Sequence, residues 1–382
     1  MPLTQTCSDP VCIRNARVTD IDPLATLERA CFDGDRISRR QFRYLIAKAN
    51  ASVLVLEREA ELVANAVLLF SRATSVGRLY SMAVTPAARG KGLGKRLLKA
   101  AETEAWAHHR AYLRLEVRKD NAAALALYHS LGYRRIGEYP GYYDDHMDAL
   151  RLEKSLAADL HPELAQVPFY EQSLEFTCGA ASLMMAMKSL RPESIEMSRQ
   201  LELRLWREAT TIFMHSGHGG CGPYGLALAA VQRGFGVDIF VSGEGTHLID
   251  SVRSTHKKEV IRLVQEDMYQ QLQSLRVPIT CTGVSMAEIE ACMARGGIPL
   301  VLISSWQIYH ERQAHWVVVT GFDDNFIYVN DPFVDRDEGE TPTDSIHMPI
   351  LREKFESMAR YGRVGLQAMV VLYRNPGESD RA

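Results

Sequence analysis

The first half of the chain is organised by the stretch LYSMAVTPAARGKGLGKRLL, Leu79 to Leu98. This stretch begins with an apolar run that predicts a strand, breaks at Thr85-Pro86 and resumes with the apolar spacing of a helix. The glycines between the two elements allow the backbone to approach a ligand closely, and the free amides that begin the helix favour an anion such as a pyrophosphate. Taken alone, the pattern fits either a phosphate-binding loop or a tight turn.

A second segment, LEVRKDNAAALALYHSLGY, covers Leu115 to Tyr133. Together with R-G-K-G-L-G in the glycine loop, it resembles the signatures of the GNAT acetyltransferases, and most of all the protein N-terminal acetyltransferases of the RimI type, which modify ribosomal protein alanine. The resemblance covers Arg14 to Leu156. The hydrophobic pattern predicts a strand over Arg14–Thr19, two helices and three further strands before the glycine loop, which is the order expected of a GNAT fold.

This resemblance implies that the cofactor is acetyl-CoA. The cofactor-binding residues that it implies are Met82, Ala83, Val84, Arg89, Gly90, Lys91, Gly92, Leu93, Gly94, Lys95 and Asn121. The backbone of the first three is expected to pair with the pantetheine arm, and the loop residues are expected to hold the pyrophosphate. Asn121 is expected to contact the cofactor, although asparagine is also a common helix cap.

The resemblance also assigns two catalytic positions. Glu116 is expected to act as the general base through a water molecule, and Tyr128 as the general acid that protonates the departing thiolate. Glu116 lies in a predicted strand beside the cofactor strand, and Tyr128 lies two helical turns after Asn121, so both can face one ligand. The alternatives are a solvated glutamate and a half-buried core tyrosine.

The acceptor is less well defined by the resemblance. The Pro-Trp pair that the family usually carries after its first helix is replaced by the acidic stretch Phe32-Asp33-Gly34-Asp35-Arg36, whereas Tyr142-Tyr143 matches the paired tyrosines that flank the peptide groove. A peptide or protein N-terminal amine is therefore expected, without specificity for a ribosomal protein.

Composition limits the partners and the compartment. The 382 residues carry a net charge of -3, which gives no electrostatic footprint for nucleic acid, and no apolar run approaches the roughly 20 residues of a membrane helix. The N-terminus, MPLTQTCSDP, lacks an apolar secretory core. Seven cysteines without a Cys-x-x-Cys pair indicate reduced thiols, so a cytoplasmic protein is expected; nothing in the sequence indicates its oligomeric state.

The chain is long enough for two domains. The expected boundaries are a GNAT domain over 12–156, a linker over 157–166 (AADLHPELAQ), a second domain over 167–375 and a tail over 376–382. Within the second domain, helices are expected near Ile195–Met214 and Val252–Leu275, and a buried strand over Ile298–Ile303.

The second domain opens with a candidate nucleophile. Cys178 stands at the start of an amphipathic helix, where the helix dipole and the free amides favour a nucleophilic thiolate. Gln172, slightly upstream, can offer a side-chain N–H to an oxyanion beside the amide of Cys178. A cysteine alone is more often a small buried hydrophobe than a nucleophile, so a base is required elsewhere in the sequence.

The base is expected in AHWVVVTGFDDNFIYVNDP. His315 opens one predicted strand and Asp331 ends the next, with a turn centred near Asp323 between them. Direct pairing across this turn would place the imidazole opposite the carboxylate, as an orienting pair requires.

These four residues, Gln172, Cys178, His315 and Asp331, resemble the catalytic constellation of the bacteriocin-processing peptidases that cut double-glycine leaders, a papain-like family. The resemblance covers Val167 to Leu372 and rests on the landmarks Q-x5-C-G-A-A, H-W-V-V-V-x-G and N-D-P. It implies an α+β papain-like fold, with Cys178 as nucleophile, His315 as base and Gln172 as a donor to the oxyanion.

One further cluster, His215, His218 and Cys221, lies in HSGHGGCGPYG. Because the run is glycine-rich and a fourth ligand is not evident, we expect a loop that lines the peptide cleft and no bound metal.

The sequence therefore predicts an α/β two-domain enzyme in which a GNAT N-acetyltransferase is fused to a cysteine peptidase that acts on a peptide. The fusion motivates the hypothesis that both sites act on one peptide, which the sequence itself does not decide. Two alternatives stay open for the second domain: a non-catalytic peptide-binding module, and a cysteine-dependent acyl or peptidyl transferase.

Overall fold

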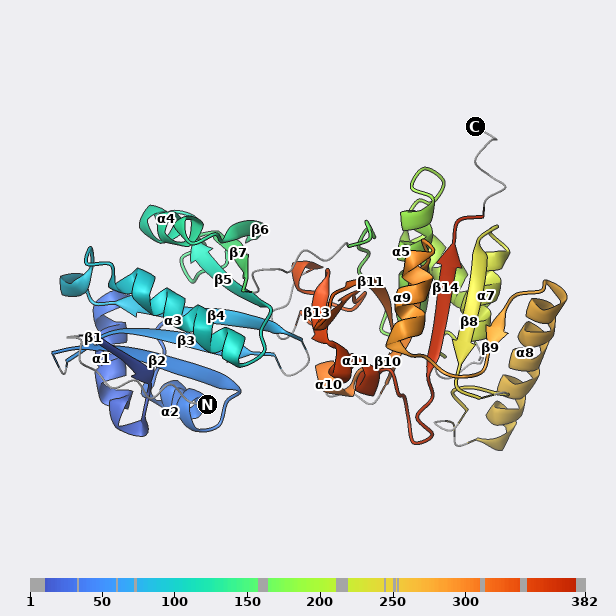
Figure 1. Cartoon of the computed structure of the whole chain (residues 1–382), viewed down its shortest axis with the longest axis horizontal. Helices are drawn as coiled ribbons and strands as arrows, with labels where there is room; N and C mark the ends of the chain where they lie inside the picture. Colours follow the sequence, from blue (N-terminus) through green and yellow to red (C-terminus); the bar gives the residue numbers. More distant parts are fainter. Residues whose placement is uncertain are drawn as a thin grey trace. The chain divides into compact units, whose positions relative to one another are not determined.

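The structure is a computed structural model of the whole chain (Figure 1). The chain divides into two compact units, Met1–Leu160 and His161–Ala382, and each is described by itself. The structure describes residues 11–32, 34–59, 61–71, 74–156, 164–210, 219–243, 245–249, 252, 254–309, 313–336 and 342–375. The expected tail, and the expected linker before residue 164, lie outside these ranges.

The first unit is built on a seven-stranded mixed sheet with the strand order β1-β2-β3-β4-β5-β7-β6. The strands are β1 Val11–Asn15, β2 Ala51–Arg58, β3 Glu61–Phe70, β4 Val76–Val84, β5 Tyr112–Arg118, β6 Arg134–Tyr139 and β7 Ala149–Ser155. β4 and β5 run parallel, and the other neighbours are antiparallel. Because β7 lies between β5 and β6, its side chains stand directly opposite those of β5.

Helices cover both faces of this sheet. They are α1 Ile21–Cys31, α2 Arg39–Ala47, α3 Leu93–Ala107 and α4 Ala122–Ser130. Successive side chains of β3 point to opposite faces, so that Ala66 and Leu68 join the core with α3 while Val67 joins the core with α1 and α2. Figure 1 shows α3 lying along one face of the sheet. The expected mixed sheet with flanking helices is confirmed.

The first strand differs from the prediction. A strand is expected over Arg14–Thr19, but β1 spans Val11–Asn15 and a 3-10 turn, η1, follows at Val18–Asp20. The carboxylate of Asp20 accepts a hydrogen bond from the amide of Arg17 at 2.6 Å. This local bond stabilises a turn in place of a longer strand.

The second unit contains another seven-stranded mixed sheet, with the strand order β13-β12-β11-β10-β14-β8-β9. The strands are β8 Gly236–Val241, β9 Ile279–Thr280, β10 Ile298–Ser304, β11 Ala314–Phe322, β12 Phe326–Asn330, β13 Met348–Leu351 and β14 Ala368–Tyr373. β8 and β9 are parallel and the other neighbours antiparallel. β10 coincides with the buried strand predicted from Ile298.

Helices also cover both faces of the second sheet. They are α5 Cys178–Leu190, α6 Arg199–Ala209, α7 Pro223–Val231, α8 Thr255–Ser274, α9 Met286–Ala294, α10 Trp306–Tyr309 and α11 Arg352–Met358. Alternate residues of β10 separate two cores: Leu300 and Leu302 pack with α5 and α7, whereas Val301 and Ile303 pack with α9 and α11. The fold therefore buries the N-terminal half of α5, where Cys178 lies, against the central strands.

The longest described helix, α8, begins and ends close to the predicted bounds of Val252–Leu275. Its buried positions include Ile261, Gln265 and Met268, and the remaining surface is largely polar. Within the part of the chain that the structure describes, no helix is both long enough and apolar enough to cross a bilayer.

The cysteines differ in one respect from the prediction. The free thiols are Cys31, Cys178, Cys221, Cys281 and Cys292. Cys12 is disulfide-bonded, and its partner lies outside the described residues. The expectation of reduced thiols throughout is therefore wrong at Cys12, because a count of cysteines does not reveal which of them lie close together.

Candidate active sites

The strands β4 and β5 separate part of the way along the sheet. Their parallel ladder joins Val76–Leu79 to Tyr112–Leu115 and ends there. β4 continues to Val84 beside β3 alone. The two strands therefore form a fork, and Glu116 is the first residue of β5 beyond the part that pairs with β4.

The free side of β4 presents backbone groups to this fork. The amide of Thr85 donates to the carbonyl of Val63 at 2.9 Å, which makes these opposed residues a hydrogen-bonded pair. Hydrogen-bonded and non-bonded pairs alternate in an antiparallel ladder, so the backbone groups of Met82 and Val84 point away from β3. Ala83 belongs to a bonded pair and faces β3. Of the three residues expected to bind the pantetheine arm, Met82 and Val84 thus direct their backbone away from β3, and Ala83 does not. The carbonyl of Val84 accepts hydrogen bonds from Nε of Arg89 at 3.1 Å and from Sγ of Cys31 at 3.4 Å.

The glycine loop has the features needed to bind the pyrophosphate of the cofactor. Gly90 and Gly92 have φ angles of 75° and 74°, which favour glycine, and Gly92 precedes α3 without a side-chain cap on its first amides. Arg89 and Lys91 lie in the same loop and donate to main-chain carbonyls nearby. Uncapped amides at a helix N-terminus next to two cations fit a pyrophosphate.

Glu116 is held by two guanidinium groups. Its Oε2 accepts from Nε of Arg78 at 2.8 Å, and its Oε1 lies 3.4 Å from Nε of Arg151, the residue directly opposite it on β7. Arg78 also donates to the hydroxyl of Tyr142 at 2.8 Å. The side chain of Glu116 is only 6% exposed. The predicted general base is therefore a buried carboxylate in an ion-paired network.

Tyr128 and Asn121 belong to α4. Burial raises the pKa of Tyr128 to about 12, so its hydroxyl keeps its proton at neutral pH, as a general acid must. The side chain of Asn121 accepts from the amide of Ala124 at 3.1 Å and so caps the helix. This cap uses the carbonyl oxygen of Asn121, and a contact between its side-chain nitrogen and the cofactor stays a prediction.

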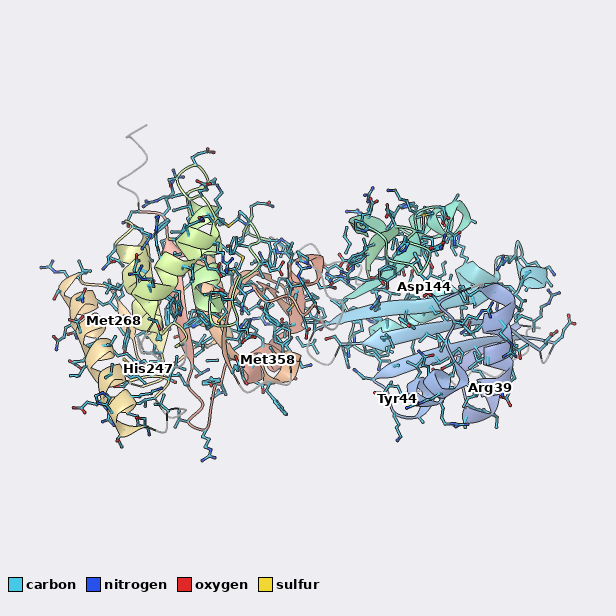
Figure 2. All side chains as sticks on the ribbon, turned by 180° about the vertical axis from the view of Figure 1, so that it is seen from behind. Arg39, Tyr44, Asp144, His247, Met268 and Met358 are labelled. Carbon is cyan, nitrogen blue, oxygen red and sulfur yellow. The ribbon has the colours of Figure 1, made fainter. Side chains whose placement is uncertain are left out.

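The residues expected near the acceptor come from two loops. Tyr142 is 44% exposed and stacks on Tyr139, with ring centroids 5.6 Å apart. Asp35 interacts with Asp144, which Figure 2 labels, and burial together with this neighbour raises the pKa of Asp35. Asp33 lies outside the described residues.

The predicted nucleophile lies at the N-terminus of α5. Cys178 is the first residue of the helix and is 5% exposed. At the next position, a Cβ on Gly179 would lie 2.9 Å from Cβ of Cys221 and 3.1 Å from Cδ1 of Trp316. Only glycine allows this first turn to pack so closely on Cys221, just before α7, and on Trp316 of β11, and the close packing fixes the position of the thiol.

His315 and Asp331 form the predicted orienting pair. The Nε2 atom of His315 lies 2.6 Å from Oδ1 of Asp331, and both residues are buried. Burial disfavours the charged imidazole, but pairing with Asp331 and interaction with Cys178 raise the pKa of His315 to about 10. Because Asp331 occupies Nε2, the Nδ1 atom is the one left for the thiol of Cys178.

The register of this pair differs from the prediction. Val318 is opposite Asn330, and an irregularity follows Val319, so His315 and Asp331 are not directly opposed. Asp331 lies just past the end of β12 and reaches His315 diagonally, at a separation that long side chains span. The predicted contact is present, and the predicted direct pairing is wrong because the turn is centred beyond Asp323: Phe322 pairs with Ile327, and Val318 with Asn330.

Tyr309, a residue that the sequence analysis missed, completes the pair. Its hydroxyl donates to Oδ2 of Asp331 at 2.9 Å, and its ring meets the His315 ring edge to face, with centroids 6.1 Å apart. The amide of Phe333 donates to Oδ1 of Asp331. Both oxygens of the carboxylate are thereby oriented.

Gln172 is attached to the same region through its backbone. Its amide donates to the carbonyl of Pro332 at 2.8 Å, next to Asp331. Its side-chain nitrogen donates to the carbonyl of Leu174 at 3.0 Å, and its Oε1 is buried without a partner among the described residues. One N–H of the side-chain nitrogen remains for an oxyanion.

Glu202 anchors the loop that carries Gln172 and Cys178. This fully buried carboxylate of α6 accepts hydrogen bonds from the amide and hydroxyl of Ser173, from Thr177 and from Tyr170. The helical spacing of the sequence indicates this role only weakly: it places Glu202 on the same face of α6 as the buried residues Leu205 and Ala209.

The cluster considered for zinc is only partly described. His215 and His218 lie outside the described residues, and Cys221 is a buried thiol whose pKa is raised by burial. Among the described residues, no group of three histidine, cysteine or acidic side chains is arranged to hold a metal ion.

Residues 167–373 match the model of a protein family, DUF3335, described as a Peptidase_C39 like family. The match spans more than half of the chain. The chain belongs to this family. The resemblance of the second half to bacteriocin-processing peptidases is thereby confirmed, and this Peptidase_C39-like unit contains the Cys178, His315 and Asp331 constellation.

The unit that precedes the Peptidase_C39-like domain is a GNAT domain, since residues 21–133 match the model of the acetyltransferase (GNAT) family. That family uses acetyl-CoA as acetyl donor. An uncharacterized protein of Mycobacterium leprae is 34% identical over 145 residues, and N-alpha-acetyltransferase RimI of Mycobacterium tuberculosis is 43% identical over 65 residues. The matches cover 36% and 17% of this chain, and 38% and 39% of those proteins.

A solved structure is similar to this part of the chain. The ribosomal-protein-S18-alanine N-acetyltransferase from Escherichia coli is 27% identical, with a TM-score of 0.36. The similarity covers 38% of this chain and 94% of that one.

In the Peptidase_C39-like unit, the structure brings His315 into contact with both Asp331 and Cys178, and joins the backbone of Gln172 to that of Pro332, next to Asp331. In the GNAT unit it adds Arg78 and Arg151, which the sequence analysis missed. Arg151 could have been found only from the strand order, because β7 is far from β5 in sequence.

Proposed function

We propose that the GNAT unit transfers the acetyl group of acetyl-CoA to the N-terminal amine of a peptide or protein. The observation that carries this proposal is the fork between β4 and β5, where β4 pairs with β3 alone, the glycine loop follows β4 and Glu116 lies on β5. The similarity to a protein named N-alpha-acetyltransferase RimI supports this acceptor.

Acetyl-CoA, when bound, supplies the acetyl group as a thioester. Met82 and Val84 would hold the arm of the cofactor through backbone hydrogen bonds, and the amides that begin α3 would hold its pyrophosphate. Glu116 would take one proton from the incoming ammonium through water, which leaves a neutral amine to attack the carbonyl carbon. Tyr128 would give its proton to the departing sulfur.

The test is acetylation of a peptide panel with different first residues, followed by mass spectrometry in the parent, Glu116→Gln and Tyr128→Phe. General acid and base groups contribute about 100-fold or more to a rate, so we expect each variant to lose at least about that factor in kcat. Tyr44→Phe, at an exposed position on α2, is the control. Acetylation at the parent rate in both variants would show that the two roles are assigned wrongly, and no acetylated peptide in the parent would refute the proposed activity.

A second activity is favoured by the buried contact between His315 and Asp331. We propose that the Peptidase_C39-like unit is a cysteine peptidase. Cys178 would bond to the carbonyl carbon of the scissile amide, and His315 would pass the thiol proton to the leaving amine. Water would then release the acyl group and return a proton to the sulfur, with the carboxylate of Asp331 orienting the imidazole throughout.

The test is the rate of alkylation of Cys178 by iodoacetamide across pH, followed peptide by peptide in the parent and His315→Ala. An ordinary thiol titrates near pH ~8.5. Because His315 carries a raised pKa of about 10, it stays positively charged at neutral pH and stabilises a thiolate. We expect Cys178 to react well below pH 8 in the parent and to behave as an ordinary thiol in His315→Ala.

The outcome separates the remaining alternatives. Ordinary reactivity in both proteins would favour a peptide-binding module without catalysis. Early reactivity that yields a stable acyl-enzyme, released only by an added amine, would favour an acyl or peptidyl transferase.

A further inference from the structure

The predicted base, Glu116, is not free to act as a base in this structure. Both of its oxygens face guanidinium groups, those of Arg78 and Arg151. Uptake of a proton would cancel the charge of the carboxylate and with it both attractions. A rearrangement of at least one ion pair must therefore accompany catalysis, if Glu116 has the role given above.

Arg78 and Arg151 differ in their access to solvent. The side chain of Arg78 is 34% exposed, whereas that of Arg151 is 6% exposed and lies directly opposite Glu116 across the β5–β7 ladder. Arg151 is thus fixed by the sheet. Arg78 lies in the paired part of β4, next to Leu79, where the ladder to β5 ends, and its side chain is partly open to solvent.

The surroundings of Arg78 form a small open site. Its Nη2 atom donates to the hydroxyl of Tyr142, and its guanidinium carbon lies 5.8 Å from the ring centroid of Tyr80. Both rings are nearly half exposed. A partly exposed guanidinium in contact with two exposed tyrosines suits an anionic group on an aliphatic stem, and its planar fork matches a carboxylate.

Two acidic residues that closely follow Tyr142 in the chain interact with other residues. Asp145 pairs with Arg118 at 2.9 Å, and Asp144 interacts with Asp35. Glu116 is therefore the carboxylate with which an acidic acceptor would compete for Arg78.

We propose that Arg78 selects acceptors that carry a carboxylate next to the reacting amine, and that binding of this carboxylate releases Glu116 to take the ammonium proton. The inference rests on the acetyl transfer proposed above. A peptide with an acidic second residue meets the requirement. The substrate thereby removes one of the two ion pairs that keep the base occupied, so an acceptor without the carboxylate leaves Glu116 doubly paired.

The experiment compares three peptides that differ only at the second residue, Ala-Glu, Ala-Gln and Ala-Lys, as acceptors for the full chain. A hydrogen-bonded charge pair contributes roughly 10-fold or more in affinity or rate. We expect kcat/KM for the Glu peptide to exceed that for the Gln peptide by at least about 10-fold. We expect the ratio of kcat/KM between the Glu and Gln peptides to fall to about 1 in Arg78→Met, because the Glu peptide loses the guanidinium that distinguishes it.

Two further variants keep the test decisive. Arg78→Lys retains the charge without the planar fork and should keep only part of the preference for the Glu peptide. It serves as the main variant if Arg78→Met does not fold. Arg43→Met, on the exposed surface of α2, removes a charge away from the fork and should keep the parent ratio.

The possible failures are distinguishable. Equal use of the Glu and Gln peptides by the parent, or an acidic preference that persists in Arg78→Met, would overturn the role of Arg78 while acetyl transfer stands. No transfer to any peptide, including those of the wider panel, would instead refute the activity on which the inference depends.

Discussion

At the scale of single residues, the protonation state of each catalytic group depends on the charged side chains next to it. His315 is charged at neutral pH because two neighbours outweigh its burial, and Glu116 is an occupied base because two arginines converge on it. Each state is set by atoms a few ångströms away. Single substitutions at these positions are therefore the sharpest tests.

Tyr309 provides one such test. Its hydroxyl orients the Asp331 carboxylate, and loss of one hydrogen bond to a charged group costs about 1.5 kcal/mol, or roughly 10-fold in rate. We expect Tyr309→Phe to slow alkylation of Cys178 at pH 7 by roughly 10-fold. Above about pH 9.5, where an ordinary thiol is already mostly thiolate, the rate of alkylation should be the same as in the parent. An equal loss at both pH values would point to a general change in access to Cys178.

At the scale of elements, α7 and α8 are joined by a buried histidine. The amide of His247 donates to Oε1 of Gln265, and the side-chain nitrogen of Gln265 donates back to the carbonyl of His247, both at 2.8 Å. The Nε2 atom of the His247 ring lies 3.1 Å from the hydroxyl of Tyr224. Figure 2 shows His247 beside α8, where Met268 is labelled. Burial lowers the pKa of His247 to about 4.

This burial predicts an acid-sensitive helix contact. Below about pH 6.5 the unfolded chain binds a proton at His247 that the folded chain does not bind until about pH 4. The free energy of unfolding should therefore fall between these pH values by up to about 3 kcal/mol from this residue alone.

The measurement is urea unfolding at pH 7 and pH 4.5 in a Trp106→Phe background. The remaining tryptophans, Trp206, Trp306 and Trp316, then all report on the second unit. His247→Gln should lose less stability on acidification than the parent. An identical loss in both proteins would show that other groups cause the acid sensitivity.

The contact between α6 and α7 gives a second prediction at this scale. A Cβ on Gly225 would lie 2.4 Å from the carbonyl oxygen of Ala209, a backbone atom that cannot turn aside. We expect Gly225→Ala to reduce the free energy of unfolding of the second unit by about 2 kcal/mol or more, as in overpacked cores. Gly220→Ala, where the added carbon meets nothing within 4 Å, should change it by less than about 0.5 kcal/mol.

At the scale of the whole molecule, the two sets of catalytic residues belong to two units with separate cores. We propose that both act on one peptide, so that the new N-terminus made at Cys178 is acetylated at Glu116. The fusion of the two domains motivates this proposal.

A library of peptides with dimethylated N-termini tests the coupling. Because the blocked amines cannot be acetylated, any acetylated N-terminus must arise from cleavage. We expect acetylated products in the parent, unacetylated cleavage products in Tyr128→Phe, and neither in Cys178→Ser. Cleavage by the parent without acetylation of any product would contradict the coupling and leave two independent activities.

Local sequence patterns determined much of this protein by themselves. The glycine loop before α3, the helix that begins at Cys178 and the alternation along β10 all depend on residues close together in the chain, where backbone preferences and hydrophobic period act directly. The pairing of His315 with Asp331 was also predictable, because a single turn separates their strands.

Only the tertiary structure decided which distant groups meet. Arg151 reaches Glu116 because β7 is inserted between β5 and β6, and Glu202 reaches the loop before Cys178 because α6 packs on α5. The register of the β11–β12 ladder likewise places His315 and Asp331 diagonally and not directly opposite each other. Strand order and helix packing result from burying two apolar faces of each sheet at once, so no local sequence pattern contains them. They also determine which charged groups lie beside the catalytic residues of both proposed sites.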